Sequence, residues 1–149
     1  MRYDRMCRVL LLVGACLLWG TPSTQAGLPM TITDATFTDG VANRTPQMRV
    51  TAFSLGDQGN QARLWFWFLV SCGDPCQGGA ASITVRWSQK VGDQFAEQRA
   101  IPLTIQGPTW RTWAYKENLQ PGTWKAEVIS EQGPVCMSDK CEFTIEVTP

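Results

Sequence analysis

Four cysteines in two close pairs are the residues best placed to do chemistry in this sequence. Cys72 and Cys76 are separated by three residues, and Cys136 and Cys141 by four. These spacings approach those of zinc sites, but the chain contains no histidine, and an even number of cysteines in an exported chain favours disulfides. A thiol oxidoreductase is also disfavoured, because its motif has two intervening residues and opens a helix. We therefore predict two disulfides and no metal site.

The connectivity of these disulfides stays open, because four cysteines allow three pairings. Bonds within each close pair would staple the loops 71–80 and 133–141 locally. A short closed loop removes less entropy from the unfolded chain than a long one. Bonds between the two loops are therefore the alternative, and they require both loops to lie at the same end of the fold.

Catalysis has few candidate residues. Histidine, the commonest general base, is absent, and cysteines held in disulfides supply no thiolate nucleophile. Two carboxylates on opposite sides of a bond could hydrolyse a glycoside, and acidic loops could bind calcium, but the spacing of the acids marks neither arrangement. The acids considered are Asp34, Asp39, Asp57, Asp93, Glu97 and Glu127. We predict a protein that is not an enzyme and binds no cofactor.

Tryptophans are the best candidates for binding. Planar rings aligned on an exposed sheet face can stack on sugar rings, whereas rings at alternating strand positions more often fill the core. Arg86 or Arg111 could donate hydrogen bonds to such a sugar. The candidate binding residues are Trp65, Trp67, Trp110, Arg111 and Trp113.

The first 26 residues are typical of an export signal. Three arginines precede an apolar run over 9–19, and small residues before Gly27 fit a cleavage site after Ala26. The run is shorter than the roughly 20 residues that a membrane span needs, so we expect no transmembrane span. A minority alternative treats 13–16 as a lipobox, with Cys16 as a lipid anchor. We expect a periplasmic or secreted protein whose single domain is 27–149.

The charge of the exported chain excludes nucleic acid as a partner. Residues 1–26 hold three arginines and one aspartate, so the 13 basic and 13 acidic side chains of the full chain fall to ten and twelve. The remaining arginines are scattered among acids, whereas nucleic-acid binding needs a basic patch or stripe.

Short apolar or alternating runs separated by turn residues predict an all-β domain. The run 63–70 is apolar on both faces, which indicates a central strand. Pro102 cannot donate to a ladder, so its strand should lie at an edge or a bulge. About eight antiparallel strands and two disulfides indicate a two-sheet β-sandwich, immunoglobulin-like or jelly-roll-like. The predicted strands are 32–37, 48–55, 63–70, one that begins at 83 and ends near 92, 95–105, 109–115, 122–130 and 141–147.

The most distinctive pattern is a Trp-Arg-Thr-Trp segment at 110–113 followed by a Pro-Gly-Thr-Trp turn and strand at 121–124. It is accompanied by Trp87, Phe143 and the segments 35–41, 43–46, 101–103, 107–109, 118–120 and 125–128. Together these resemble the domain-of-unknown-function family 2914, over nearly all of 27–149. The resemblance implies a bacterial, often envelope-associated β-sandwich with no established activity. Ala114 and Tyr115 replace serines typical of that family, and the cysteine loops look like local additions.

These features predict a non-catalytic interaction module of the bacterial cell envelope. The partner we expect first is an envelope protein, bound by strand addition or by an apolar patch. The alternative is a polysaccharide, bound by a carbohydrate-binding module that uses exposed tryptophans. A hydrolase ranks third and would require two carboxylates facing one cleft.

Overall fold

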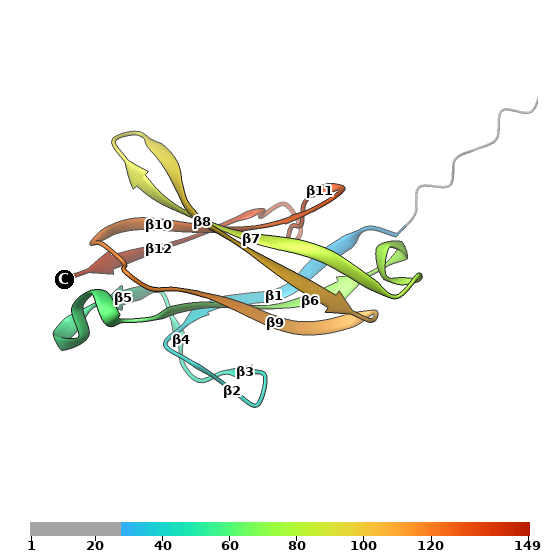
Figure 1. Cartoon of the computed structure of the whole chain (residues 1–149), viewed down its shortest axis with the longest axis horizontal. Coiled ribbons are helices and arrows are strands. Elements are labelled where there is room, and N and C mark those ends of the chain that lie inside the picture. The colour runs from blue at the N-terminus through green and yellow to red at the C-terminus, as the bar shows by residue number, and fades with distance from the viewer. Residues whose placement is uncertain (1–27) are drawn as a thin grey trace, which may run out of the picture.

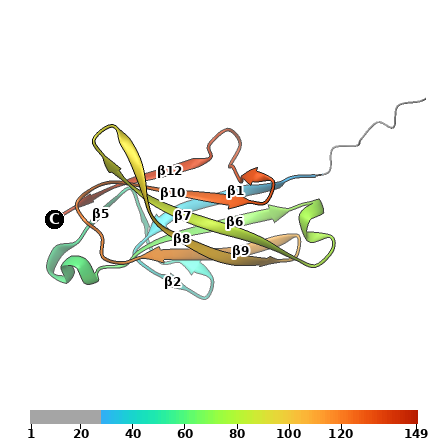
Figure 2. The same cartoon turned by 45° about the horizontal axis from the view of Figure 1, so that its top comes forward.

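The structure, a computed structural model, describes residues 28–149, and these form two mainly antiparallel sheets packed as a sandwich (Figures 1 and 2). The predicted export signal and the lipid-anchor alternative at Cys16 lie outside the described residues. No helix within 28–149 is long and apolar enough to cross a bilayer. The all-β class predicted from the sequence is confirmed.

The strands are of unequal length, and two 3-10 turns interrupt them. The long strands are β1 (Met30–Thr38), β6 (Leu64–Cys72), β7 (Ala80–Val91), β8 (Gln94–Gln106), β9 (Thr109–Lys116), β10 (Gly122–Ser130) and β12 (Glu142–Thr148). The short ones are β2 (Val41–Ala42), β3 (Thr45–Pro46), β4 (Arg49–Val50), β5 (Ala52–Ser54) and β11 (Gly133–Pro134). The 3-10 turns are η1 (Gly56–Gln61) and η2 (Asp74–Cys76).

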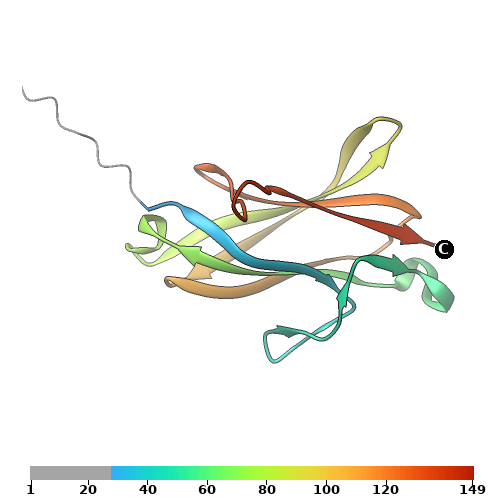
Figure 3. The ribbon, with the colours of Figure 1, turned by 180° about the vertical axis from the view of Figure 1, so that it is seen from behind.

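Strand order defines the two layers. The first sheet runs β4-β1-β6-β9, and the second runs β5-β12-β10-β7-β8 with β11 added beside β10. Strands β2 and β3 form a separate hairpin that hangs below the first sheet in Figure 1 and is seen from behind in Figure 3. The β5–β12 pair is parallel, whereas the other named pairs are antiparallel.

The core lies between the two sheets and is centred on Phe66. This side chain is fully buried, and its ring centroid lies 5.0 Å from that of Phe143, 5.2 Å from that of Phe37 and 5.3 Å from that of Phe68. Trp87 packs edge-on against Phe66 from the opposite sheet, at 6.5 Å. These rings come from both layers, so their burial holds the sandwich together.

Alternation along the strands largely follows the sequence prediction. In β12 the buried Phe143, Ile145 and Val147 alternate with exposed residues, as expected. Strand β8 ends the second sheet and carries Pro102, which confirms the edge position predicted for it.

The predicted strand 48–55 is wrong as a single element. The chain breaks at Thr51, so that β4 pairs with β1 in the first sheet and β5 pairs with β12 in the second. Leu55 then holds the end of this segment against the second sheet, because its side chain is buried and its amide donates to the Thr148 carbonyl at 3.0 Å. A run of alternating residues therefore serves as a crossover between the layers.

Both disulfides form within the close pairs, Cys72–Cys76 and Cys136–Cys141. The alternative of bonds between the two loops is thereby wrong, although both loops do lie at the same end of the sandwich (Figure 1). Backbone hydrogen bonds tie each loop to a neighbour: the Cys72 amide donates to Pro108, and the Ile32 amide donates to Cys136. The disulfides thus staple loops that the strands already hold.

Replacing either cysteine pair by alanines should lower the free energy of unfolding by about 2 kcal/mol, the entropy expected for so short a closed loop. The Cys72→Ala/Cys76→Ala variant should lose more than the Cys136→Ala/Cys141→Ala variant, because Cys72 is buried. Urea unfolding followed by circular dichroism measures both. Equal midpoints for wild type and both variants would contradict this prediction.

Candidate functional site

The outer face of the first sheet gathers most of the aromatic residues that are not in the core. Along β6, Trp65, Trp67 and Leu69 alternate with the core residues. Strand β9 places Tyr115, Trp113 and Arg111 directly opposite them. A double row of large side chains therefore runs along the two strands, on the side facing away from the second sheet.

Trp67 is removed from this surface by the β2–β3 hairpin. Its side chain is only 4% exposed, and its indole N–H donates a hydrogen bond of 2.9 Å to the Arg44 carbonyl at the hairpin tip. Trp67 is therefore not available to stack on a ligand, which corrects its place among the candidate binding residues. The strand is covered on its outer face at this point, as a central strand buried on both faces requires.

The hairpin itself is a tight two-residue turn. Asn43 and Arg44 both have positive φ, at 51° and 62°, which is the pattern of a type I′ turn. At its base the fully buried Thr38 hydroxyl donates to the Gly40 carbonyl at 2.9 Å and lies 3.3 Å from the Met48 amide. This buried hydroxyl links both arms of the loop and so holds the hairpin over the sheet.

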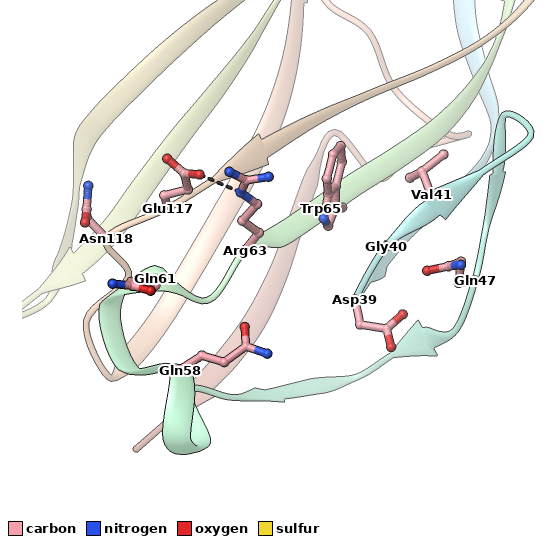
Figure 4. A pocket seen from close by; sticks show the side chains of 10 residues that line it. All are labelled: Asp39, Gly40, Val41, Gln47, Gln58, Gln61, Arg63, Trp65, Glu117 and Asn118. Atoms are coloured by element: carbon pink, nitrogen blue, oxygen red, sulfur yellow. Dashed lines mark hydrogen bonds and ion pairs between the residues drawn. The ribbon is translucent and has the colours of Figure 1, made fainter.

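A cleft of about 680 Å³ opens between this hairpin, the η1 turn and the end of β9 (Figure 4). We call it the aromatic cleft. Trp65 stands at its centre, between polar side chains that come from three separate parts of the chain. Its lining residues are Asp39, Gly40, Val41, Gln47, Gln58, Gln61, Arg63, Trp65, Glu117 and Asn118.

Trp65 is held in place by its neighbours. Its ring centroid lies 4.8 Å from that of Tyr115 in a tilted arrangement, and the Arg63 guanidinium carbon lies 5.2 Å from the Tyr115 ring. Arg63 also forms a 2.5 Å ion pair with Glu117. The half-buried rings of Trp65 and Tyr115 thus lie beside the Arg63–Glu117 ion pair. Part of the Trp65 ring remains open to the cleft.

Gly40 shapes the wall of the cleft. A side chain on Gly40 would collide with the amide of Gln47, which lies across the base of the hairpin. The Gln47 backbone amide donates to the Gly40 carbonyl at 2.9 Å. Because this contact is with the end of a flexible side chain, a larger residue at position 40 would displace the Gln47 side chain from the cleft rather than separate the two arms.

Two charged groups on the strands of the first sheet have displaced pKa values. Hydrogen bonding from Arg49 holds the pKa of Asp34 below its usual value, and this pair ties β4 to β1 at 2.5 Å. Burial lowers the pKa of Lys116, with the charge of Arg99 acting in the same direction and Glu117 against it. Lys116 points inward, with its ammonium 5.2 Å from the Trp124 ring and bonded to the Glu117 carbonyl, and so supports the backbone that presents Glu117.

A second hollow of about 340 Å³, which we call the arginine pocket, lies further along the same sheet. It is lined by Arg44, Leu69, Thr109, Trp110 and Arg111. The Arg44 guanidinium carbon lies 4.5 Å from the Trp110 ring, which also packs against the core. Trp110 and Arg111 therefore lie here, away from Trp65.

The structure thus divides the residues singled out from the sequence. Trp65 lies in the aromatic cleft, Trp110 and Arg111 in the arginine pocket, and the half-buried Trp113 between them in β9. Sequence reasoning missed Arg44, Tyr115 and the polar lining. Tyr115 continues the alternation of Arg111 and Trp113, which could have identified it, whereas the lining amides come from loops that carry no such period.

Within 28–149, no group of three or more histidine, cysteine, aspartate or glutamate side chains could hold a metal ion. The donors that face the aromatic cleft are instead amides, an ion pair and the single carboxylate of Asp39. This donor set suits hydrogen bonding to hydroxyl groups rather than cation coordination.

Residues 80–145 match the sequence model of a family described as "Protein of unknown function (DUF2914)". The resemblance predicted from the tryptophan segments is thereby confirmed for this stretch, which runs from the start of β7 into β12. The matched stretch contributes β9 to the site, whereas the hairpin, the η1 turn and Trp65 lie before it. A comparison with curated proteins finds no match.

Acrylamide quenching of tryptophan fluorescence should separate the rings of the outer face. Trp65→Phe and Trp113→Phe should each lower the quenched fraction, because both rings are partly exposed. Trp67→Phe should instead raise it slightly, since the hairpin covers that ring and the variant removes a shielded emitter. A larger loss of quenching in Trp67→Phe than in Trp65→Phe would contradict the placement of the hairpin.

Thr38→Val should loosen the hairpin without unfolding the sandwich. The variant removes the buried hydroxyl that both arms of the loop share, a change worth about 1–3 kcal/mol when polar partners are left unpaired. Acrylamide should then reach Trp67. The matched control is Thr36→Val on the same strand, whose hydroxyl bonds only the neighbouring Phe37 carbonyl, and it should leave quenching as in wild type.

Proposed function

We propose that this domain is a non-catalytic carbohydrate-binding module of the bacterial cell envelope, with the aromatic cleft as its site. The observation that carries the proposal is the partly open Trp65 ring, framed by polar side chains that converge from three parts of the chain. Sugars present apolar faces and rims of hydroxyl groups, so a ring beside many hydrogen-bonding groups matches them.

The chemistry of the lining favours a polyhydroxylated ligand over an apolar one. Gln47, Gln58, Gln61 and Asn118 each offer both donors and an acceptor, and Asp39 adds carboxylate acceptors. Such groups can bind neighbouring hydroxyls in pairs. The volume of about 680 Å³ lies within the usual range for ligand pockets.

Hydrolysis is the competing activity, because Asp39 and Glu117 both line the cleft. Glycoside hydrolysis needs one carboxylic acid that donates a proton to the leaving group. Glu117 already forms a 2.5 Å ion pair with Arg63, so its carboxylate is engaged within the protein. This pairing supports binding without catalysis.

The test is affinity electrophoresis of the purified protein in gels that contain soluble neutral polysaccharides, namely xylan, mixed-linkage β-glucan and methyl-esterified polygalacturonate, with sedimentation on purified peptidoglycan as a second assay. Trp65→Ala should weaken binding by roughly tenfold or more, as expected for truncation of a central aromatic contact. Phe95→Ala is the matched control, since Phe95 is a half-buried ring on β8 in the other sheet.

Two results would contradict the proposed activity, and a third would contradict the proposed site. One is the absence of binding to every polysaccharide in both assays. The other is release of reducing sugar from a bound polysaccharide, which would make the protein a hydrolase. Binding that Trp65→Ala and Phe95→Ala weaken equally would place the ligand outside the cleft.

A protein partner remains the second candidate, and the free edge of β9 favours it. Among the residues that the structure describes, β9 ends the first sheet and pairs with β6 alone. An extended segment of an envelope protein could add a strand there through backbone hydrogen bonds. Such binding would be insensitive to Trp65→Ala, because Trp65 lies on the face of β6 and not on that edge.

A further inference from the structure

We infer that the arginine pocket binds the carboxylate of an acidic sugar, so that the preferred ligand is a polysaccharide with uronic-acid-type residues. The inference rests on the proposed function, since it extends the aromatic cleft along the same sheet. Arg44, Arg111 and Trp110 carry it, because they bring two cations and an aromatic ring to one hollow of about 340 Å³.

Neither guanidinium has an acidic partner. The ion pairs found within 28–149 use Arg49, Arg63, Arg86 and Lys125, and none includes Arg44 or Arg111. The two positive charges at this hollow repel each other. An anion bound between them would attract both and so offset that repulsion. Guanidinium groups also match the planar carboxylate with paired hydrogen bonds.

Arg44 occupies a backbone position where a smaller residue would be easier to place. Its φ of 62° lies in the left-handed region, which glycine, asparagine and aspartate adopt most readily. The turn nevertheless aims this long cation over the Trp110 ring at 4.5 Å. The aromatic ring fixes the direction of the guanidinium and leaves its N–H groups free for a ligand.

The two hollows lie on the same outer face of the first sheet, on either side of the β2–β3 hairpin, and the outward side chains of β9 form a row, which we call the track. Tyr115, Trp113 and Arg111 follow one another on the outer face, opposite Trp65, Trp67 and Leu69. Tyr115 lies four positions after Arg111 in β9, so the two residues are about 13 Å apart along the strand. An extended oligosaccharide can therefore contact Trp65 with one sugar and Arg111 with another.

Charge is distributed unevenly along this track. Asp39, Asp57 and Glu117 lie around the aromatic cleft and the hollow beside it, whereas the arginine pocket contains no acid. An acidic chain is attracted at one end and repelled at the other. This asymmetry places the carboxylate-bearing sugar at Arg44 and Arg111 and a sugar that presents hydroxyls at Trp65.

The experiment compares polygalacturonate with its methyl-esterified form, which has the same backbone but no free carboxylates. Wild type should bind polygalacturonate about tenfold more tightly, as expected for charge-assisted hydrogen bonds, and this preference should fall as sodium chloride rises from 50 to 500 mM. Arg44→Gln and Arg111→Gln should each reduce the preference, and the double variant should abolish it. Arg86→Gln, which makes the same charge change on the other sheet, should retain it.

The outcomes separate the two proposals. Equal affinity of wild type for both polymers, or a preference that survives in the double variant, overturns the carboxylate site. Binding of the esterified polymer that depends on Trp65 then still supports the aromatic cleft. No binding of either polymer overturns the carboxylate site. Arg44→Lys, which keeps the charge but not the paired donors, should retain part of the preference if folding is intact.

Discussion

Strand β6 is apolar on both faces, and this constraint shapes most of the structure. Its inner face needs the second sheet, which supplies Phe143 and Trp87 to the cluster around Phe66. Its outer face needs a cover as well, because Trp67 would otherwise expose a large ring. The β2–β3 hairpin provides that cover through the bond between the indole and the Arg44 carbonyl. By standing on the sheet, the hairpin also creates walls for a cleft on one side and a pocket on the other.

The layers and the long strands could be predicted because alternation is a local signal. Phe143, Ile145 and Val147 alternate with polar residues, and the chain reads as a strand wherever such a pattern meets a turn. Pro102 marked an edge for an equally local reason, its missing N–H. The crossover at Thr51 could not be predicted, because a strand that changes sheets has the same alternation as one that does not.

The candidate site was only partly predictable. Residue type was enough to single out Trp65, Trp110, Trp113 and Arg111. Whether each side chain is exposed, however, depends on which other segments cover it. Trp65 and Trp67 are equivalent in sequence, and a hairpin that crosses one of them decides which ring is open. The polar residues that line the cleft lie mostly in loops. There the local path of the backbone, rather than the alternation of a strand, determines where each side chain points. Arg44 is the extreme case, because its position over Trp110 follows from a turn conformation that its residue type does not favour.

Each cysteine in the described part of the chain, 28–149, is bonded to the cysteine nearest to it in sequence, Cys72 to Cys76 and Cys136 to Cys141. Partners four and five residues apart meet in the unfolded chain at high effective concentration, so correct oxidation does not depend on prior assembly of the sheets. The non-local pairs of strands, such as β1 with β6, can then form with the thiols already consumed. Of the three pairings that these four cysteines allow, the native one therefore joins the partners that short-range encounter within the chain favours.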